Sequence, residues 1–399
     1  MAIVRILRSA RFARAVLVYL AVFCGVSAFL PWVRGVDGSV APAWAVAIGF
    51  AQPFSSWWFL AGVAALFAST LACTWTKPAR TMAWWRGDLP AGAAHLPPIA
   101  GRDVVAFLRA RGFVGEGVLF RYKYALWAGL ILHWGLLALI AGVGVQQSFH
   151  DEGNFELLVG EQKDLSAPGA VFSRAVGPLG PTGPPGMLVA LEAFDPFRHQ
   201  PGFALDHFST ITIGSGPAAQ RFELDRAAGV EVEGVEVFQA IPSGLGAVVA
   251  SASGQRFALA LHEVGPHMLG AAVTDVSNVE WRLIVTTERD VNDSLGTGEI
   301  TASVQVDGAP TPVQVGVPFA FGDDTLTIVQ WTRWAGFHYA RNPGMVGVYV
   351  GFVLVLLGSL LLTFPAGLAR LPGPGDIDTR VFVLRGAEAL RLEWERGDA

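Results

Sequence analysis

Four long stretches without a charged side chain constrain this chain more than any other feature. They cover residues 15–33, 56–76, 124–149 and 342–369. A helix needs about 20 mostly apolar residues to cross the hydrocarbon core of a bilayer. The whole chain is 52% hydrophobic and only 15% charged, whereas an ordinary soluble domain carries roughly a quarter charged residues. We therefore predict a membrane protein with four transmembrane α-helices.

The first stretch resembles a signal peptide because four arginines precede its apolar core. Leu30-Pro31-Trp32 is a poor cleavage site, however, and a second apolar stretch follows soon after it. We therefore expect a retained helix. The predicted order is a tail at 1–14, a span at 15–33, a loop at 34–55, a span at 56–76, a loop at 77–123, a span at 124–146, a domain at 147–341, a span at 342–366 and a tail at 367–399.

The orientation follows from the basic residues, which concentrate on the cytoplasmic side of membrane proteins. The N-terminal tail carries four arginines, the second loop eight lysines and arginines, and the C-terminal tail five arginines, whereas the loop at 34–55 has Arg34 alone. Both termini and the loop at 77–123 are therefore expected in the cytoplasm, and the domain at 147–341 outside. Within the loop, residues 103–111 predict a short amphipathic helix on the anionic inner leaflet.

The outer domain differs in character from the apolar stretches. Short alternating or β-branched runs are separated by turn residues, which predicts a large extracytoplasmic antiparallel β domain. The runs are residues 187–191, 209–213, 230–238, 257–261, 281–287, 301–306 and 325–331. A proline- and glycine-rich segment at 177–186 predicts a rigid extended loop.

The same domain is acidic, with 10 basic and 23 acidic side chains. This charge either keeps an exposed domain soluble or attracts a basic partner. The net charge of −5 for the whole chain provides no basic field, so a nucleic acid is not an expected partner.

His133 is the main candidate for chemistry. Counted from Tyr124 at about 1.5 Å per residue, it lies roughly 13 Å into the third span, near the middle of the bilayer. No other ionisable side chain is expected deep in the four spans, and such residues are costly in a membrane. A neutral imidazole there can ligate haem iron, relay a proton or hydrogen-bond a neighbouring helix.

Two other histidines are weaker candidates. His150 follows the third span and His338 precedes the fourth, so both are expected at the outer interface. The chain has two cysteines and none of the nucleophile, phosphate-binding, zinc or covalent-haem motifs. We therefore expect no catalytic residue, and whether the chain is part of an enzyme stays open.

The layout resembles the ResB family of system II cytochrome c biogenesis proteins over most of the chain. Three segments carry the resemblance in order and spacing. They are Ser56-Trp-Trp-Phe with Leu71-Ala-Cys-Thr and Arg80, then His133-Trp-Gly-Leu-Leu with Gly142 and Gly160-Glu161, and finally Arg341-Asn-Pro-Gly with Gly351 and Leu356-Leu-Gly358.

The resemblance implies a bacterial inner-membrane protein that assembles c-type cytochromes. Members of the family work together with a ResC/CcsA-type partner to move haem b outward, keep its iron reduced and join it to apocytochrome c thiols. A thioredoxin-like thiol reductant is a further candidate partner. The matching histidine, His133, would then be an axial haem ligand, and the tryptophan-rich haem-presenting motif of the partner has no counterpart here. The alternative is a membrane-anchored scaffold whose outer domain docks apocytochrome or the partner without binding haem.

Overall fold

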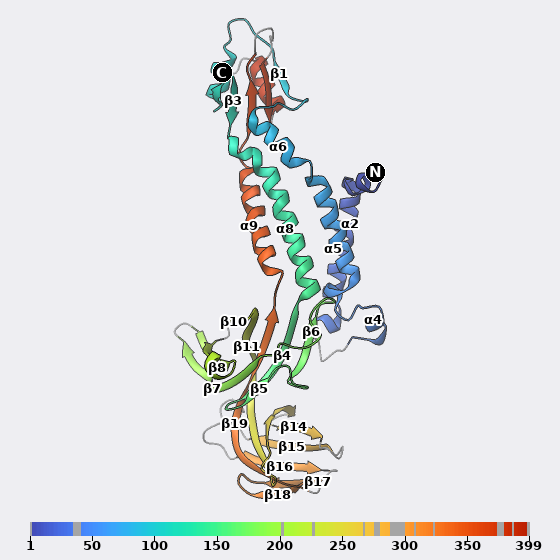
Figure 1. Cartoon of the computed structure of the whole chain (residues 1–399), viewed down its shortest axis with the longest axis vertical. Coiled ribbons are helices and arrows are strands. Elements are labelled where there is room, and N and C mark those ends of the chain that lie inside the picture. Colours follow the sequence, from blue (N-terminus) through green and yellow to red (C-terminus); the bar gives the residue numbers. More distant parts are fainter. Residues whose placement is uncertain are drawn as a thin grey trace. The chain divides into compact units, whose positions relative to one another are not determined.

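The chain forms two compact units in a computed structural model: Met1–Phe149 with Pro343–Ala399, and His150–Asn342. Each unit is described separately below (Figure 1). The structure describes residues 2–34, 41–200, 203–225, 228–265, 268–274, 280–287, 300–306, 309–321, 324–372, 379–384 and 387–396.

Apolar helices dominate the first unit. Three candidate membrane spans are long and apolar enough to cross a bilayer: Ala10–Ala28, Trp57–Arg86 and Lys123–Phe149. A fourth apolar helix, Met345–Leu361, has 17 residues. The helical elements of this part are α1 (Ala2–Leu7), α2 (Ala10–Ala28), α3 (Pro31–Arg34), α4 (Ala43–Ala47), η2 (Pro53–Ser55), α5 (Trp57–Thr74), α6 (Lys77–Arg86), η3 (Lys123–Trp127), α8 (Ala128–Phe149) and α9 (Met345–Leu361).

The helix ends differ from the predicted spans for local reasons. Helix α2 begins five residues before the predicted start because the Ser9 hydroxyl accepts a hydrogen bond from the backbone N–H of Arg11. It ends at Ala28, shortly before Pro31, since a proline disfavours helix in the residue before it. Helix α9 likewise ends before Pro365, so it is shorter than the predicted 342–366.

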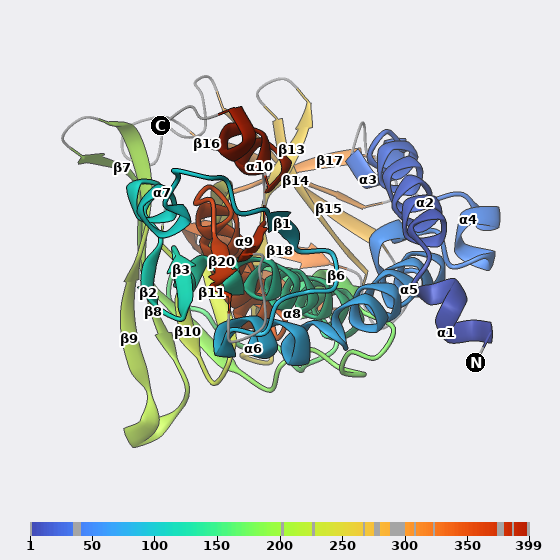
Figure 2. The same cartoon turned by 90° about the horizontal axis from the view of Figure 1, so that it is seen from above.

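Helices α8 and α9 touch backbone to backbone. A Cβ atom on Gly351 would lie 2.4 Å from the backbone nitrogen of Leu139, and one on Gly142 would lie 2.6 Å from that of Val348. Only glycine permits so close an approach, and small residues drive helix association in membranes because they bring backbones together. Seen along the helices, α8 lies between α9 and α5, and α2 lies beyond α5 (Figure 2).

The first unit also contains a small sheet built from two distant parts of the chain. Its order is β1-β21-β20-β3-β2, with β20 pairing antiparallel to both β3 and β21. Its strands and covering helices are β1 (Ala94–Leu96), β2 (Val114–Glu116), β3 (Val118–Arg121), β20 (Gly367–Arg370), β21 (Thr379–Val383), α7 (Val104–Ala110) and α10 (Ala387–Arg396).

Helix α7 corrects the prediction of a helix on the membrane surface. Asp103 caps it, since Oδ1 accepts hydrogen bonds from the N–H groups of Val105 and Ala106. Its apolar residue Leu108 is fully buried in a core shared with Trp394 of α10. The apolar face therefore packs inside this subdomain, so it is not available to a lipid surface.

The second unit consists of antiparallel sheets, as predicted. A seven-stranded sheet has the order β10-β11-β19-β4-β6, with β12 on β11 and β18 on β19; the others are β5-β7-β8-β9 and β13-β14-β15-β16-β17. The elements are β4 (Asp151–Leu158), β5 (Gln162–Asp164), β6 (Val171–Val176), β7 (Leu188–Gln200), β8 (Phe203–Ile213), η4 (Gly216–Ala218), β9 (Gln220–Leu224), β10 (Val230–Val232), β11 (Val235–Ser251), β12 (Arg256–Ala260), β13 (His262–Gly265), β14 (Met268–Thr274), β15 (Glu280–Thr287), β16 (Ile300–Val306), β17 (Ala309–Val313), β18 (Pro318–Phe321) and β19 (Asp324–Arg341).

All seven predicted runs overlap strands, and the run at 230–238 is a hairpin. Val232 pairs with Val235, and the two turn residues between them, Glu233 and Gly234, have φ values of 52° and 74°. Two positive φ angles are typical of the two-residue turn that matches the twist of a hairpin.

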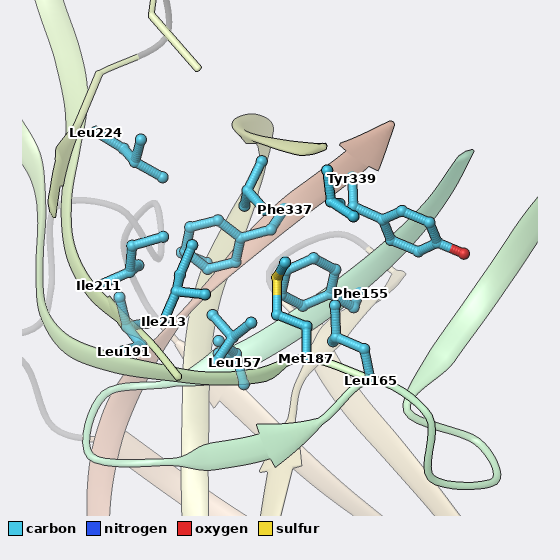
Figure 3. Close-up of a cluster of buried hydrophobic side chains, with 14 residues drawn as sticks. Phe155, Leu157, Leu165, Met187, Leu191, Ile211, Ile213, Leu224, Phe337 and Tyr339 are labelled. Carbon is cyan, nitrogen blue, oxygen red and sulfur yellow. The ribbon is translucent and has the colours of Figure 1, made fainter. Parts of the chain in front are cut away.

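Alternate residues of β4 and β19 build one hydrophobic core of this unit. Phe155 and Phe337 pair across the two strands, with ring centroids 5.4 Å apart, and both are fully buried (Figure 3). The hydroxyl of Tyr339 points away from the other labelled side chains of this cluster (Figure 3). The neighbouring residues of β4, such as Glu152 and Asn154, therefore face the opposite side of the sheet.

Candidate functional site

His133 lies in the second turn of α8, and both of its ring nitrogens have partners. Nδ1 is 2.7 Å from the carbonyl oxygen of Gly129, one turn earlier in the helix. Nε2 is 2.5 Å from Nζ of Lys77, the first residue of α6. The histidine therefore connects α8 to the segment that follows α5.

With Lys77 protonated, these two contacts fit one tautomer of the imidazole. A carbonyl oxygen can only accept, so Nδ1 carries the hydrogen, and an ammonium can only donate, so Nε2 must offer its lone pair to Lys77. A protonated ring would direct an N–H at an ammonium 2.5 Å away. The geometry thus gives a neutral His133 whose Nε2 lone pair is the one that a metal ion would take.

The sequence predicted no other ionisable side chain deep in the spans, but the Lys77 side chain lies beside His133. The sequence placed the end of the second span at residue 76, but the candidate span continues through Trp57–Arg86. Thr70 and Thr74 satisfy their hydroxyls with carbonyl oxygens one turn back, and Lys77 follows immediately as α6 begins. The half-buried ammonium of Lys77 is therefore placed beside the His133 imidazole.

His133 lies toward one end of the contact between α8 and α9. A Cβ on Gly358, in the last turn of α9, would lie 2.6 Å from the nitrogen of Leu132, whereas Gly344 at the other end of α9 meets Gly142 and Gln146. The sequence count began at Tyr124, and the candidate span begins at Lys123, so the mid-span position of His133 stays a prediction.

Aromatic and cationic side chains surround the start of α8. Lys123 Nζ lies 4.3 Å from the ring centroid of Trp85 and 4.4 Å from that of Phe120. The Trp85 ring also contacts Tyr124 and Trp127, at 5.5 Å and 6.0 Å. Such cation–π contacts stabilise lysine without a carboxylate partner.

The two weaker histidine candidates belong to the β-sheet unit. His338 faces Asn154 across β19 and β4, with Nδ1 3.1 Å from Asn154 Oδ1 and Nε2 3.8 Å from Glu152 Oε2. His150 is buried just before β4, and its Nδ1 has no hydrogen-bond partner. His150 precedes Asn154, the cross-strand partner of His338, by four residues, or about 13 Å of extended chain, which separates the two histidines. Within the described residues, no group of three or more histidine, cysteine or acidic residues could hold a metal ion.

A buried ion pair in the β-sheet unit escaped the sequence analysis. Asp151 is fully buried, and its Oδ1 accepts hydrogen bonds from Arg174 Nε at 2.7 Å and from the Tyr339 hydroxyl at 3.2 Å. Burial and the Asp151 carboxylate raise the pKa of Tyr339 to about 12. The Arg174 Nη2 group donates 2.8 Å hydrogen bonds to the carbonyl oxygens of Pro181 and Gly183. The cluster therefore anchors the proline- and glycine-rich loop to the sheet.

A second titratable pair links two sheets of this unit. His262 at the start of β13 lies 3.3 Å from Glu156 of β4, and its ring packs on Trp334 of β19 with centroids 4.9 Å apart. The hydrogen bond to Glu156 is the main reason that the pKa of His262 lies above its ordinary value, although burial lowers it. Protonated His262 therefore strengthens the link.

Comparison with known protein families finds no match for this chain, and a search of curated proteins finds no significant relative.

Proposed function

We propose that this protein is a membrane subunit of a system II cytochrome c maturation complex, and that it helps to hold haem for transfer to apocytochrome c. The fold supplies what such a subunit needs, namely apolar helices able to sit in a bilayer and a large β-sheet unit inserted between two of them. The residues that resemble the ResB family connect this fold to that role. Its proposed setting is the bacterial inner membrane, beside a ResC/CcsA-type partner.

The packing of α9 on α8 supports a fourth span. The two helices contact each other from Gly344 near Gly142 to Gly358 near Leu132. If α8 crosses a bilayer, α9 therefore occupies the same depth, and its 17 residues cover about 26 Å. The chain enters α8 from β3 and leaves α9 into β20, and these strands are paired at Leu119 and Ala369.

The same connection supports a proposed side of the membrane for each part of the chain. The sheet containing β3 and β20 belongs to segments rich in arginine and lysine, which favours the cytoplasm, and the acidic β-sheet unit is then outside. In that position the β-sheet unit would meet apocytochrome c. Both chain termini would be cytoplasmic.

The family-like glycines already have a structural explanation. Gly135, Gly142, Gly351 and Gly358 all lie where α8 and α9 touch. They therefore support the helix pairing and provide no separate argument for haem. His133 is different, because its contacts leave a chemical role open.

His133 is the observation that carries the proposal. Its Nδ1–H donates to the Gly129 carbonyl oxygen, so the neutral ring is held with its Nε2 lone pair directed away from its own helix. This donor fits haem iron, which a neutral histidine nitrogen binds. One imidazole provides one axial ligand, so the second would come from the partner. The chain alone is therefore not expected to act as a haem synthase.

Haem co-purification tests the proposal. The full chain is expressed with its tryptophan-rich partner, purified in detergent, and compared with His133→Ala, with His338→Ala as the matched control. We expect the Soret absorption per protein to fall strongly in His133→Ala and to stay near the wild-type value in the control. Equal haem in all three proteins would contradict the proposal.

A scaffold function is the second candidate, and the Lys77 contact favours it. In that case His133 pairs with Lys77 to join α8 to α6, and the β-sheet unit docks a partner without haem being bound. His133→Ala would then lower the melting temperature while leaving the haem content of the complex unchanged.

A further inference from the structure

The imidazole nitrogen proposed for iron is already occupied. Lys77 Nζ lies 2.5 Å from His133 Nε2 and donates to its lone pair. A haem iron held by His133 would use that same lone pair. The ammonium and the metal therefore cannot use His133 at the same time.

Among the residues that the structure describes, no carboxylate forms an ion pair with the Lys77 ammonium. In the described part of the chain, His133 is the one hydrogen-bond partner of the Lys77 Nζ atom. The charged group one turn further along α6 is Arg80, which carries the same charge. Lys77 is therefore held in place by the imidazole itself.

The lysine also has freedom to leave. Its side chain is half-buried, and four rotatable bonds allow the ammonium to move several ångströms without a change in the helix. Lys123, by contrast, is fixed between Trp85 and Phe120. Of these two lysines near the start of α8, Lys77 is thus the one that can exchange with a ligand.

We propose that Lys77 masks the His133 Nε2 atom in the haem-free protein and is displaced when an iron porphyrin binds. This inference rests on the proposed function, and it assigns to Lys77 the control of the affinity of His133 for the iron porphyrin. Displacement costs a hydrogen bond to a charged group. Such bonds are worth enough to alter affinity by about ten- to a hundredfold.

Titration of the haem-free full chain with iron(III) protoporphyrin tests the mask. Lys77→Met removes the donor while retaining an unbranched side chain, and Lys77→Arg retains a donor. We expect Lys77→Met to bind about ten- to a hundredfold more tightly than wild type, and Lys77→Arg and the matched Lys123→Met to bind within a few fold of it. If wild type binds the porphyrin, unchanged or weaker binding by a folded Lys77→Met would overturn the inference.

A haem-free measurement separates this inference from the proposed function. Diethyl pyrocarbonate modifies an imidazole nitrogen only when its lone pair is free, and peptide mass spectrometry reports the rate at His133. We expect a faster rate in Lys77→Met than in wild type or Lys77→Arg, with the rate at His338 unchanged. If that rate rises but neither wild type nor Lys77→Met binds the porphyrin, the mask stands and the haem function fails. If the rates at His133 are equal, the mask fails whatever the porphyrin does.

Discussion

Removal of the Asp151 carboxylate should destabilise the β-sheet unit far more than removal of its neighbour in sequence. Asp151 is fully buried and accepts hydrogen bonds from Arg174 and Tyr339. Glu152 is half-exposed and reaches His338 at only 3.8 Å. Loss of one member of a buried ion pair costs about 3–5 kcal/mol because the other charge stays buried without its partner.

The lower end of that range applies to Asp151→Ala. The Arg174 side chain is 20% exposed, and it keeps its hydrogen bonds to the carbonyl oxygens of Pro181 and Gly183. We therefore expect a loss of about 3 kcal/mol in the free energy of unfolding. At about 2–4 °C per kcal/mol for a unit of this size, the melting temperature should fall by about 6–12 °C.

The assay is thermal unfolding of the full chain in detergent, followed by near-UV circular dichroism. Glu152→Ala is the control and should shift the melting temperature by less than about 2 °C. Tyr339→Phe removes one of the two donors to Asp151 Oδ1 and should cost about 1 kcal/mol, or about 2–4 °C. Similar shifts for Asp151→Ala and Glu152→Ala would refute the reasoning.

Three further predictions concern other parts of the structure. Gly351→Ala places a Cβ 2.4 Å from the Leu139 nitrogen, so overpacking should lower the free energy of unfolding by about 1–3 kcal/mol. Gly25→Ala is the control: its Cβ meets nothing within 4 Å, and the change should be neutral or stabilising in the same thermal assay. The His262–Glu156 pair stabilises the β-sheet unit fully at pH values below the ordinary histidine pKa of about 6.5, and this effect is lost as the pH rises through the raised pKa of the folded state. Between pH 6 and about 8.5, the melting temperature of wild type should therefore fall more than that of His262→Gln. Parallel curves of melting temperature against pH for the two proteins would contradict this. Trp394→Ala leaves a cavity beside the buried Leu108 and should lower the free energy of unfolding of this core by about 3–5 kcal/mol. The expected result is faster proteolysis of the segments at 94–121 and 367–396. An unchanged cleavage rate would count against that packing.

Apolar length made the four apolar helices α2, α5, α8 and α9 predictable, and alternation made the strands of the second unit predictable. Both signals are local, so they locate an element within a few residues without naming its neighbours. The exact ends depended on single side chains, such as the Ser9 cap of α2.

The small sheet could not be predicted from the sequence. Its strands have three to five residues, too few for a clear alternating pattern. Leu119 also pairs with Ala369, 250 positions away along the chain. A helix at 103–111 was recognisable, but its apolar face was assigned to a membrane because the sheet that covers it was not foreseen.

The surroundings of His133 were beyond sequence reasoning for a related reason. The residue itself was identifiable as a rare imidazole in an apolar helix. Lys77 was counted as the edge of a loop, since a charge normally marks the end of a span. Only the continuation into α6 brings it to Nε2, across 56 positions of sequence. The Asp151, Arg174 and Tyr339 cluster likewise joins residues from three strands.

Chemical rescue of His133→Gly tests the central claim most directly. The variant is purified with its partner without haem, mixed with iron(III) protoporphyrin, and titrated with free imidazole while the Soret band is recorded. If His133 Nε2 is an iron ligand, the variant alone should lack the wild-type band, and imidazole should restore it at saturating concentration. A variant that shows the wild-type band before imidazole is added, or never regains it afterwards, would contradict the claim.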